Sequence, residues 1–393
     1  MKRSKLGDLC DLFSGGTPST KVDEYWNGDI PWISSAESGK DFIYDSTVKI
    51  TQKGVEESAT KKAGKGTILI ATAGEGKTRG QVSFLENDIY INQSLINISS
   101  NNNNEVDNLW LYYYLKNGYD RLRKLSDVTG VRGSLSGTLL KTFIVDFPDI
   151  ITQRKIANLL RSIDYKIEIN NRINDNLQQL SSDIFSYWFL QFEFPNEEEK
   201  PYKSSGGKMV YNKELKREIP EGWKNSTLGK STIMYQPETF DAKTLIPNGK
   251  YRVYGAGGFM GFYNSYNHEN AETFISCRGS CGNIYRSMPK SLITGNAMIV
   301  KTKDISYKHY LYLSLLKIGV KNCITGSVQP QITRDNLNDW KYCIPNISII
   351  EEFNSLINPI FLKIESIVEE NQQLVNLRDF LLPMLMNGQV TFK

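Results

Sequence analysis

The chain has 393 residues, of which 40% are hydrophobic and 23% charged, so it is long enough for about two to three domains with separate cores. Its 47 basic and 43 acidic residues leave a net charge of only +4. Five scattered cysteines argue against a disulfide scaffold, and two histidines disfavour zinc-ribbon and histidine-based catalytic classes. The chain shows no signal-peptide pattern and no apolar run long enough to span a membrane, so we expect a cytoplasmic protein.

The first 148 residues predict a mixed α/β domain. Residues 66–71 and 88–91 are expected to be strands, and residues 109–115 a short helix rich in Tyr and Leu. The stretch from Ala71 to Thr78 (ATAGEGKT) satisfies a relaxed P-loop pattern with Ala in place of the first Gly. A P-loop needs a following helix, whereas residues 79–85 predict a strand. A P-loop ATPase is therefore the weaker hypothesis, since a glycine-rich turn equally lets the backbone approach a DNA phosphate.

Residues 149–191 predict a long helix, because apolar side chains recur at alternating steps of three and four residues. A second helix with the same pattern is expected over residues 346–390. Asn174 and Asn371 occupy the same position of the apolar seam, where a buried Asn can fix register and a half-exposed Asn is simply tolerated. The seam of the two helices consists of Ile156, Leu160, Ile163, Ile167, Asn174, Leu177, Ile184, Phe353, Ile357, Ile360, Ile364, Asn371, Leu374 and Leu381.

These helices belong to an internal repeat. Residues 148–180 align without gaps to residues 345–377 at an offset of 197 and are identical at ten of 33 positions, including Glu168 and Glu365. Residues 4–7 (SKLG) also resemble residues 226–229 (STLG). The order of parts is therefore a domain (1–148), a helix (149–191), a linker (192–222), a second domain (223–345) and a second helix (346–390).

The linker is rich in charge, Gly, Pro and Ser, and its composition predicts an exposed segment. In the second domain, residues 273–276 and 297–300 are expected to be strands and residues 310–316 a helix. Residues 220–345 hold 15 basic and 8 acidic side chains, whereas residues 1–148 hold 18 of each. The surplus is typical of a phosphate-binding surface, although a solvated basic surface would look the same.

Other catalytic motifs are incomplete. Asp149 and Asp164 lie before or on the first long helix rather than on paired strands that would converge on a metal. Cys277 and Cys281 have no further ligand at zinc spacing. The chain also lacks an Asn/Asp-Pro-Pro-aromatic string, so a built-in adenine methyltransferase is not supported.

Four stretches carry a family resemblance that covers essentially the full length. Residues 15–37 (GGTPSTKVDEYWNGDIPWISSAE) and 251–264 (YRVYGAGGFMGFYN) resemble the starts of two target recognition domains. Residues 202–223 (YKSSGGKMVYNKELKREIPEGW) are similar to a family linker, and the two repeat helices complete the match. The chain thus resembles the specificity (S) subunit of a type I restriction–modification system.

The resemblance implies two mixed α/β target recognition domains joined by two long antiparallel coiled-coil helices with an internal pseudo-two-fold repeat. It implies that each domain binds one half of a bipartite double-stranded DNA site, while the helices set the gap and dock two modification (methyltransferase) subunits. S-adenosylmethionine, ATP and Mg would then belong to the modification and restriction (translocase/endonuclease) subunits. The chain itself would have no cofactor or catalytic site and would work in a bacterial or archaeal cytoplasm. A stand-alone DNA-binding protein is a second alternative.

The residues expected to contact DNA are polar or basic side chains on or after turns, because such side chains bind phosphates and read base edges. In the first domain these are Lys77, Thr78, Arg79, Gln93 and Arg132. In the second domain they are Arg252, Tyr254, Arg278, Ser280, Asn283, Arg286, Asn296, Gln329, Gln331 and Arg334.

Overall fold

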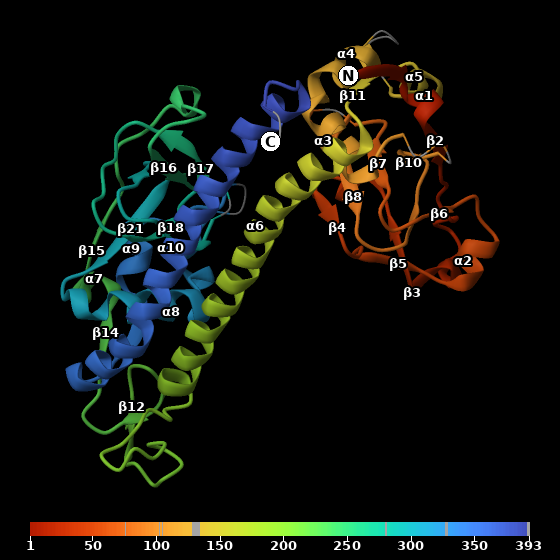
Figure 1. The fold of residues 1–393 in the computed structure, drawn as a ribbon. Coiled ribbons are helices and arrows are strands. Elements are labelled where there is room, and N and C mark those ends of the chain that lie inside the picture. The colour runs from red at the N-terminus through yellow and green to blue at the C-terminus, as the bar shows by residue number, and fades with distance from the viewer. Residues whose placement is uncertain are drawn as a thin grey trace. The chain divides into compact units, whose positions relative to one another are not determined.

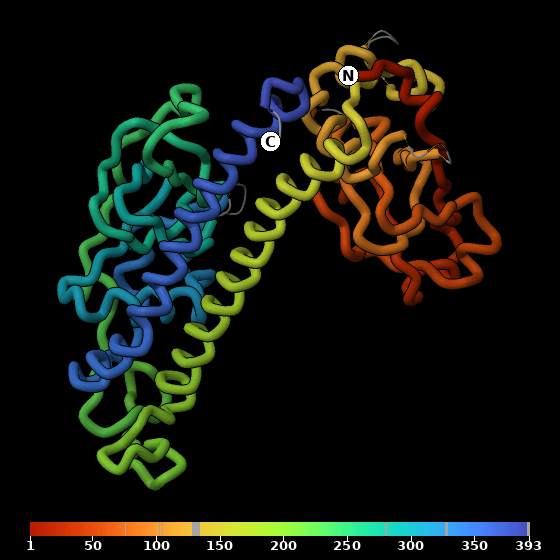
Figure 2. Tube along the Cα trace, in the orientation of Figure 1, coloured from red at the N-terminus to blue at the C-terminus, as the bar shows by residue number. Residues whose placement is uncertain are grey.

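A computed structural model describes residues 1–74, 76–101, 103, 105–127, 134–279, 281–326 and 329–390. Two of the expected DNA contacts, Arg132 and Ser280, lie outside these residues. The chain forms two compact units: unit 1 comprises Met1–Ile169 and Asn371–Lys393, and unit 2 comprises Asn170–Glu370. Figure 2 traces the chain through each of them.

The described part of unit 1 contains three sheets of short strands. The first pairs β1 (Lys2–Lys5) with β11 (Ile144–Phe147). The second has the order β2 (Cys10–Ser14), β10 (Leu95–Ser100), β7 (Ile68–Ala71), β8 (Val82–Leu85) and β4 (Phe42–Ile43). The third has the order β5 (Val48–Ile50), β3 (Trp26–Ile33), β9 (Ile89–Ile91) and β6 (Lys61–Ala63). The pairs β4/β8 and β3/β9 are parallel, and the other pairs are antiparallel.

The central strand β7 is apolar at every position because both of its faces are buried. In β7, Ile68 and Ile70 belong to the main core, while Leu69 and Ala71 belong to a smaller core on the other face. Helix α3 packs on the main core, and its N-cap Asp107 accepts hydrogen bonds from two backbone N–H groups of the first turn. The helices of unit 1 are α1 (Leu6–Leu9), α2 (Gln52–Glu56), α3 (Asn108–Asn117), α4 (Tyr119–Asp127) and α5 (Gly137–Lys141), with parts of α6 and α10.

Unit 2 repeats this plan with smaller sheets among its described residues. Strand β14 (Lys224–Thr227) pairs with β22 (Lys341–Ile344). One sheet has the order β15 (Thr232–Tyr235), β21 (Ala297–Thr302), β18 (Thr273–Ser276) and β19 (Ile284–Arg286). Another has the order β17 (Gly258–Tyr263), β16 (Tyr251–Gly255) and β20 (Leu292–Ile293), in which β16 and β20 are parallel. The helices are α7 (Leu228–Ser231), α8 (Lys308–Ile318) and α9 (Arg334–Asn338).

The linker is not the exposed segment that its composition predicts. It forms a hairpin of β12 (Met209–Asn212) and β13 (Arg217–Pro220), and its Phe192, Phe194 and Ile219 are buried in the main core of unit 2. Phe194 stacks on the Trp223 ring with 5.1 Å between ring centroids. The charged and Gly-rich residues dominate the composition, but a few aromatic side chains are enough to attach the segment to the core.

Two long helices each contribute residues to both units. Helix α6 (Ile150–Phe185) has 36 residues and continues into a π-helical turn (Ser186–Leu190), and α10 (Ile347–Met386) has 40 residues (Figure 1). In unit 1 the start of α6 shares the core with the end of α10, and in unit 2 the end of α6 shares the core with the start of α10. The helices are therefore antiparallel within each unit, which confirms the predicted fold class.

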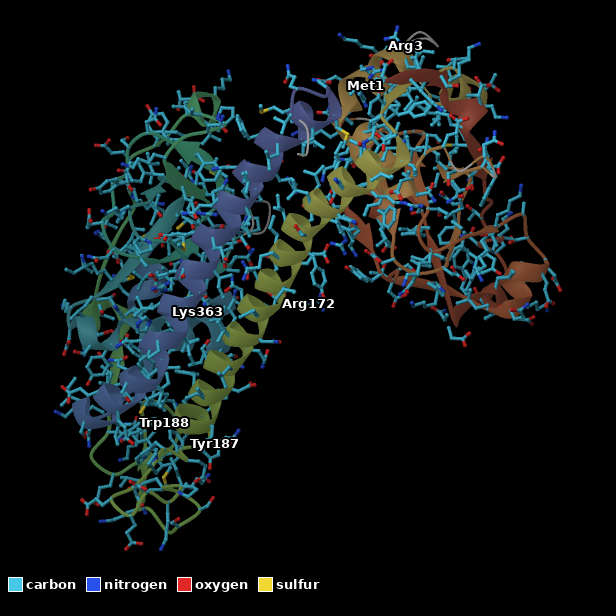
Figure 3. The ribbon with its side chains drawn as sticks, in the orientation of Figure 1. Met1, Arg3, Arg172, Tyr187, Trp188 and Lys363 are labelled. Atoms are coloured by element: carbon cyan, nitrogen blue, oxygen red, sulfur yellow. The ribbon has the colours of Figure 1, made fainter. Side chains whose placement is uncertain are left out.

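All fourteen predicted seam residues are buried or half-buried. The seam is separated from exposed charged positions such as Arg172 on α6 and Lys363 on α10, both labelled in Figure 3. On the last turn, Trp188 is buried while the neighbouring Tyr187 remains 43% exposed. This separation is what the alternating steps of three and four residues predict.

Candidate nucleic-acid interface

In unit 2 three backbone hydrogen bonds hold the turn that follows β18. The Cys277 N–H donates to the Asn296 carbonyl (3.1 Å), and the Ile332 N–H donates to the Cys277 carbonyl (3.2 Å). Within the turn, the Gly282 N–H donates to the Ser276 carbonyl (2.9 Å). These bonds bring together three segments that are distant in sequence: the turn, the start of β21 and the strand-like stretch before α9.

Several predicted DNA contacts meet on this surface. Arg278, Gln331 and Arg334 are exposed and line one hollow of about 270 Å³. Arg278 and Gln331 also line an adjacent hollow of about 500 Å³ together with Gln329. The Gln331 backbone is fixed by two hydrogen bonds with Thr325 (2.8 and 3.0 Å). Two guanidinium groups and two amides in one place supply both phosphate and base-edge hydrogen bonding.

Tyr235 and Gln236 line the same hollow but were not predicted as contacts. Tyr235 is 38% exposed, and its hydroxyl lies 2.9 Å from Nε2 of His268. Tyr235 ends strand β15 and Gln236 follows it, about 40 residues before Arg278, so no local pattern connects them to the turn. Burial alternates along β15 and turns Tyr235 outward, but the sequence Thr-Ile-Met-Tyr does not show this alternation, because the exposed Ile233 is apolar.

Unit 1 has the same three hydrogen bonds around the turn after β7. The Thr72 N–H donates to the Ser94 carbonyl (3.0 Å), the Leu135 N–H donates to the Thr72 carbonyl (2.9 Å), and the Gly80 N–H donates to the Ala71 carbonyl (2.9 Å). We call this set of bonds, present in both units, the turn frame. It places the two candidate surfaces at equivalent positions of their domains.

On the unit 1 surface, Lys77 and Gln93 are exposed and Thr78 is half-exposed. The Gln93 side-chain oxygen accepts a hydrogen bond from the Thr17 hydroxyl (2.6 Å). The described residues after Gly74 form a turn over 76–80 and then strand β8, rather than the helix that a P-loop requires. Among the described residues, the segment that follows the Ala71–Thr78 stretch therefore does not supply the helix of a nucleotide-hydrolysing P-loop.

Three predicted contacts have side chains that are largely enclosed and have partners within the protein. Arg79 is 8% exposed and pairs with Asp127 at 2.6 Å. Tyr254 is 8% exposed, and its hydroxyl accepts a hydrogen bond from the Met288 N–H. The Arg286 side chain, 14% exposed, pairs with Glu365 of α10 at 2.5 Å rather than facing outward.

The remaining predicted contacts stay on the surface of unit 2. Asn283 and Asn296 are exposed on the turn frame, and the Asn283 amide donates to the Tyr285 hydroxyl (3.3 Å). Arg252 is half-buried, with its guanidinium 4.7 Å from the centroid of the Phe259 ring. It therefore lies on the β16–β17 hairpin, apart from the hollow that Arg278 lines.

The described residues contain no group of three His, Cys, Asp or Glu side chains that could hold a metal ion. Cys277 and Cys281 are free thiols, and burial raises the pKa of Cys277 to about 11, so this thiol stays protonated at neutral pH. Among the described helices, none is long and apolar enough to cross a bilayer.

Comparison with known proteins identifies the family. The family model described as the type I restriction modification DNA specificity domain matches twice, over residues 1–179 and 220–375. The chain belongs to the family of type I restriction–modification specificity subunits. It is the DNA specificity subunit of such a system, a non-catalytic part of the complex. The two matched segments correspond to the two copies of the internal repeat.

Relatives and a solved structure agree over nearly the whole chain. The type I restriction enzyme MjaIX specificity subunit of Methanocaldococcus jannaschii is 30% identical, over 98% of this chain and 92% of the relative. The HindI specificity subunit of Haemophilus influenzae is 22% identical, over 86% and 89%. The crystal structure of the type I S subunit from M. genitalium shares the fold, with a TM-score of 0.63 and 18% identity over 98% of this chain and 95% of that one.

Proposed function

We propose that residues 1–148 and 223–345 are two target recognition domains, each of which binds one half of a bipartite double-stranded DNA site. The turn frame is the observation that carries this proposal, because it repeats in both units and presents polar and basic side chains at the same place. In the second domain these are Arg278, Gln331 and Arg334, in the part of the chain with the basic surplus. In the first they are Lys77 and Gln93.

We propose that α6 and α10 set the gap between the half-sites and that these helices dock two modification subunits. Both helices run from one unit into the other without a break, as a spacer requires. The modification and restriction subunits would supply S-adenosylmethionine, ATP and Mg, and the assembly would act in the cytoplasm. Co-purification with a modification subunit distinguishes this function from that of a stand-alone DNA-binding protein.

Long-read methylome sequencing of a host that carries this chain and its modification subunit tests the proposal directly. We expect methylated adenines in one bipartite motif with a fixed gap. A continuous motif, or no motif that depends on this chain, would contradict it.

The spacer role has its own test. Inserting four residues after Asn174, with a matching insertion after Asn371, adds about 6 Å to each helix at 1.5 Å per residue. We expect the same two half-sites with a wider gap. An unchanged gap would show that the helices do not determine the spacing.

A further inference from the structure

Each recognition domain is joined to a long helix by a buried arginine. In unit 1 this is Arg161 of α6, whose side chain is only 17% exposed. One of its nitrogens lies 2.8 Å from the carboxylate of Glu86, just after β8, and the other lies 2.9 Å from Glu168, about two turns further along the same face of α6. The guanidinium also lies 3.9 Å from the centroid of the Phe42 ring on β4. A planar cation with two carboxylates and an aromatic face has its orientation fixed in every direction.

Tyr44 completes the unit 1 cluster. Its hydroxyl accepts a hydrogen bond from Arg161 (2.9 Å) and donates one to Glu168 (2.6 Å). The loop residues around β4 and the end of β8 are thus bonded to one stretch of α6. Unit 1 holds further polar contacts of this kind, since Asp164 accepts hydrogen bonds from Tyr113 of α3 and from Arg378 of α10.

Unit 2 has the same cluster with the charges exchanged. Arg286 ends strand β19 of the domain, and its carboxylate partner Glu365 lies on α10, 2.5 Å away. The Arg286 guanidinium lies 4.6 Å from the centroid of the Phe361 ring, which stacks in turn on His309 of α8. Both members of the ion pair are nearly enclosed, with side chains 14% and 15% exposed.

The two helix carboxylates occupy equivalent positions of the internal repeat. Glu168 and Glu365 each end an identical Lys-Ile-Glu tripeptide at the offset of 197 residues. In both tripeptides the Ile is half-buried in the seam, and the Lys is exposed, as Lys363 is in Figure 3. The Glu then points to the domain rather than to the partner helix. Both copies of the repeat thus place a glutamate of the helix in contact with the domain. The arginine of the cluster lies on the helix in unit 1 and on the domain in unit 2.

We propose that these two arginine clusters are orientation clamps: Arg161 and Arg286 hold each recognition domain at a fixed angle on its helix and so determine how strictly the gap between half-sites is read. This inference rests on the proposed function. Arg286 does not line the hollows that Arg278, Gln331 and Arg334 form, and both clamps act through the rigidity of the domain–helix junction. A domain that rocks on its helix reaches half-sites at neighbouring spacings, so loss of a clamp relaxes the spacing requirement instead of removing base contacts.

A double-mutant cycle tests the clamp in unit 2. The chain is assembled with its modification subunits, and binding is measured on the natural target and on targets whose gap is one base pair shorter or longer. For Arg286→Gln we expect the preference for the natural gap to fall at least fivefold. Glu365→Gln should give the same loss, and the double variant should be no worse than either single variant. Arg334→Gln is the matched control, since Arg334 is exposed: it should weaken binding at every gap by the same factor.

Two results would overturn the clamp. One is additive losses for Arg286→Gln and Glu365→Gln, and the other is an unchanged gap preference in both variants. A second measurement does not depend on DNA: spin labels at Lys243 and Lys363, in a Cys281→Ser background, report the distance between domain and helix. The distance distribution should broaden in Arg286→Gln and stay narrow in Arg334→Gln. If DNA binding fails but this broadening appears, the proposed function is wrong and the clamp is retained as a structural feature.

Discussion

The two domains share the backbone hydrogen bonds of the turn frame but differ in the exposed side chains that this frame presents. The turn frame uses only backbone N–H and carbonyl groups, so Thr72 of one domain and Cys277 of the other make the same bonds. The exposed residues that the frame presents are Lys77 and Gln93 in unit 1, but Arg278 and Gln331 in unit 2. A surface held by backbone bonds can change its side chains without losing its shape. Such a surface suits the proposed reading of two different half-sites with one fold.

The helix-facing side of the domains differs in a more surprising way. Asp164 of α6 and Phe361 of α10 are equivalent in the repeat and both are buried, yet one belongs to an ion-pair network and the other to an aromatic cluster. These equivalent helix positions therefore carry a carboxylate in one unit and an aromatic ring in the other. Perturbing them in parallel shows whether each chemistry is essential to its own unit.

The largest expected effect comes from the buried ion pair of unit 1. Asp164→Ala removes one 2.8 Å partner of Arg378, whose side chain is 14% exposed and which keeps Asp379 at 2.8 Å, and it also removes the acceptor of the Tyr113 hydroxyl, so we expect a loss of about 3 kcal/mol in the free energy of unfolding. Phe361→Ala in unit 2 should cost a similar amount, about 3–5 kcal/mol, by leaving a cavity. Urea denaturation measures both. Glu105→Ala, which breaks the exposed Lys2–Glu105 pair, is the control and should cost less than about 1 kcal/mol.

The next largest effect should come from acid, which we expect to lower the stability of unit 2 through a residue that unit 1 lacks. Burial, with the nearby charges of Arg286 and Lys308, lowers the pKa of His309 to about 3, whereas an unfolded His has a pKa of about 6.5. The unfolded chain therefore binds more protons between these values, so stability is complete above pH 6.5 and falls as the pH falls toward 3. We expect unit 2 to lose roughly 3 kcal/mol between pH 7 and pH 4 from this residue alone.

The control for this acid effect is His309→Gln, which removes the titrating group. Its unfolding free energy should depend less steeply on pH in this window than that of the natural chain. Residues 1–169 contain no histidine, so unit 1 provides an internal reference. Equal pH dependence of the natural chain and the variant would contradict the buried neutral state.

Equivalent turn residues should contribute to DNA affinity in both domains. Arg278→Ala and Lys77→Ala each remove an exposed cation from the turn frame, and we expect the affinity of the assembled complex to fall by about 1–3 kcal/mol for the arginine and less for the lysine. Fluorescence anisotropy on the natural target measures the loss. Lys77→Ala also tests the discarded ATPase hypothesis: a decrease in nucleotide binding by this variant would revive it.

The smallest effect concerns the shared seam position. Asn174 is 8% exposed and its side-chain oxygen lacks a hydrogen-bond partner, whereas Asn371 is half-buried. Asn174→Leu should stabilise unit 2 by about 1 kcal/mol, because an unsatisfied buried oxygen is replaced by apolar surface. Asn371→Leu should be closer to neutral. Thermal unfolding of the two variants makes the comparison, and a destabilised Asn174→Leu would indicate a register role for the amide.

The sequence predicted those features that local periodicity encodes. The alternating apolar steps gave both long helices, and the apolar run at residues 273–276 coincides with β18. It failed where the partner is distant along the chain. From its sequence neighbours Arg286 is predicted to be an exposed cation near a turn, because its partner Glu365 lies 79 residues later in the chain. Arg79 fails for the same reason, since its partner Asp127 belongs to a separate helix. The composition of the linker predicts an exposed segment, but three buried side chains attach it to the core although most of its residues are polar or charged.

The pairing of β1 with β11 and of β14 with β22 has a consequence for how this chain can be altered. In each domain the entering strand lies directly beside the leaving strand, and neighbouring strands are only about 4.8 Å apart. The two ends of each domain are thus adjacent, so the domain is joined to the rest of the chain at two neighbouring points. Exchanging everything between the paired strands should replace one DNA specificity with another while the helices stay untouched, so new specificities can arise by recombination rather than by stepwise substitution.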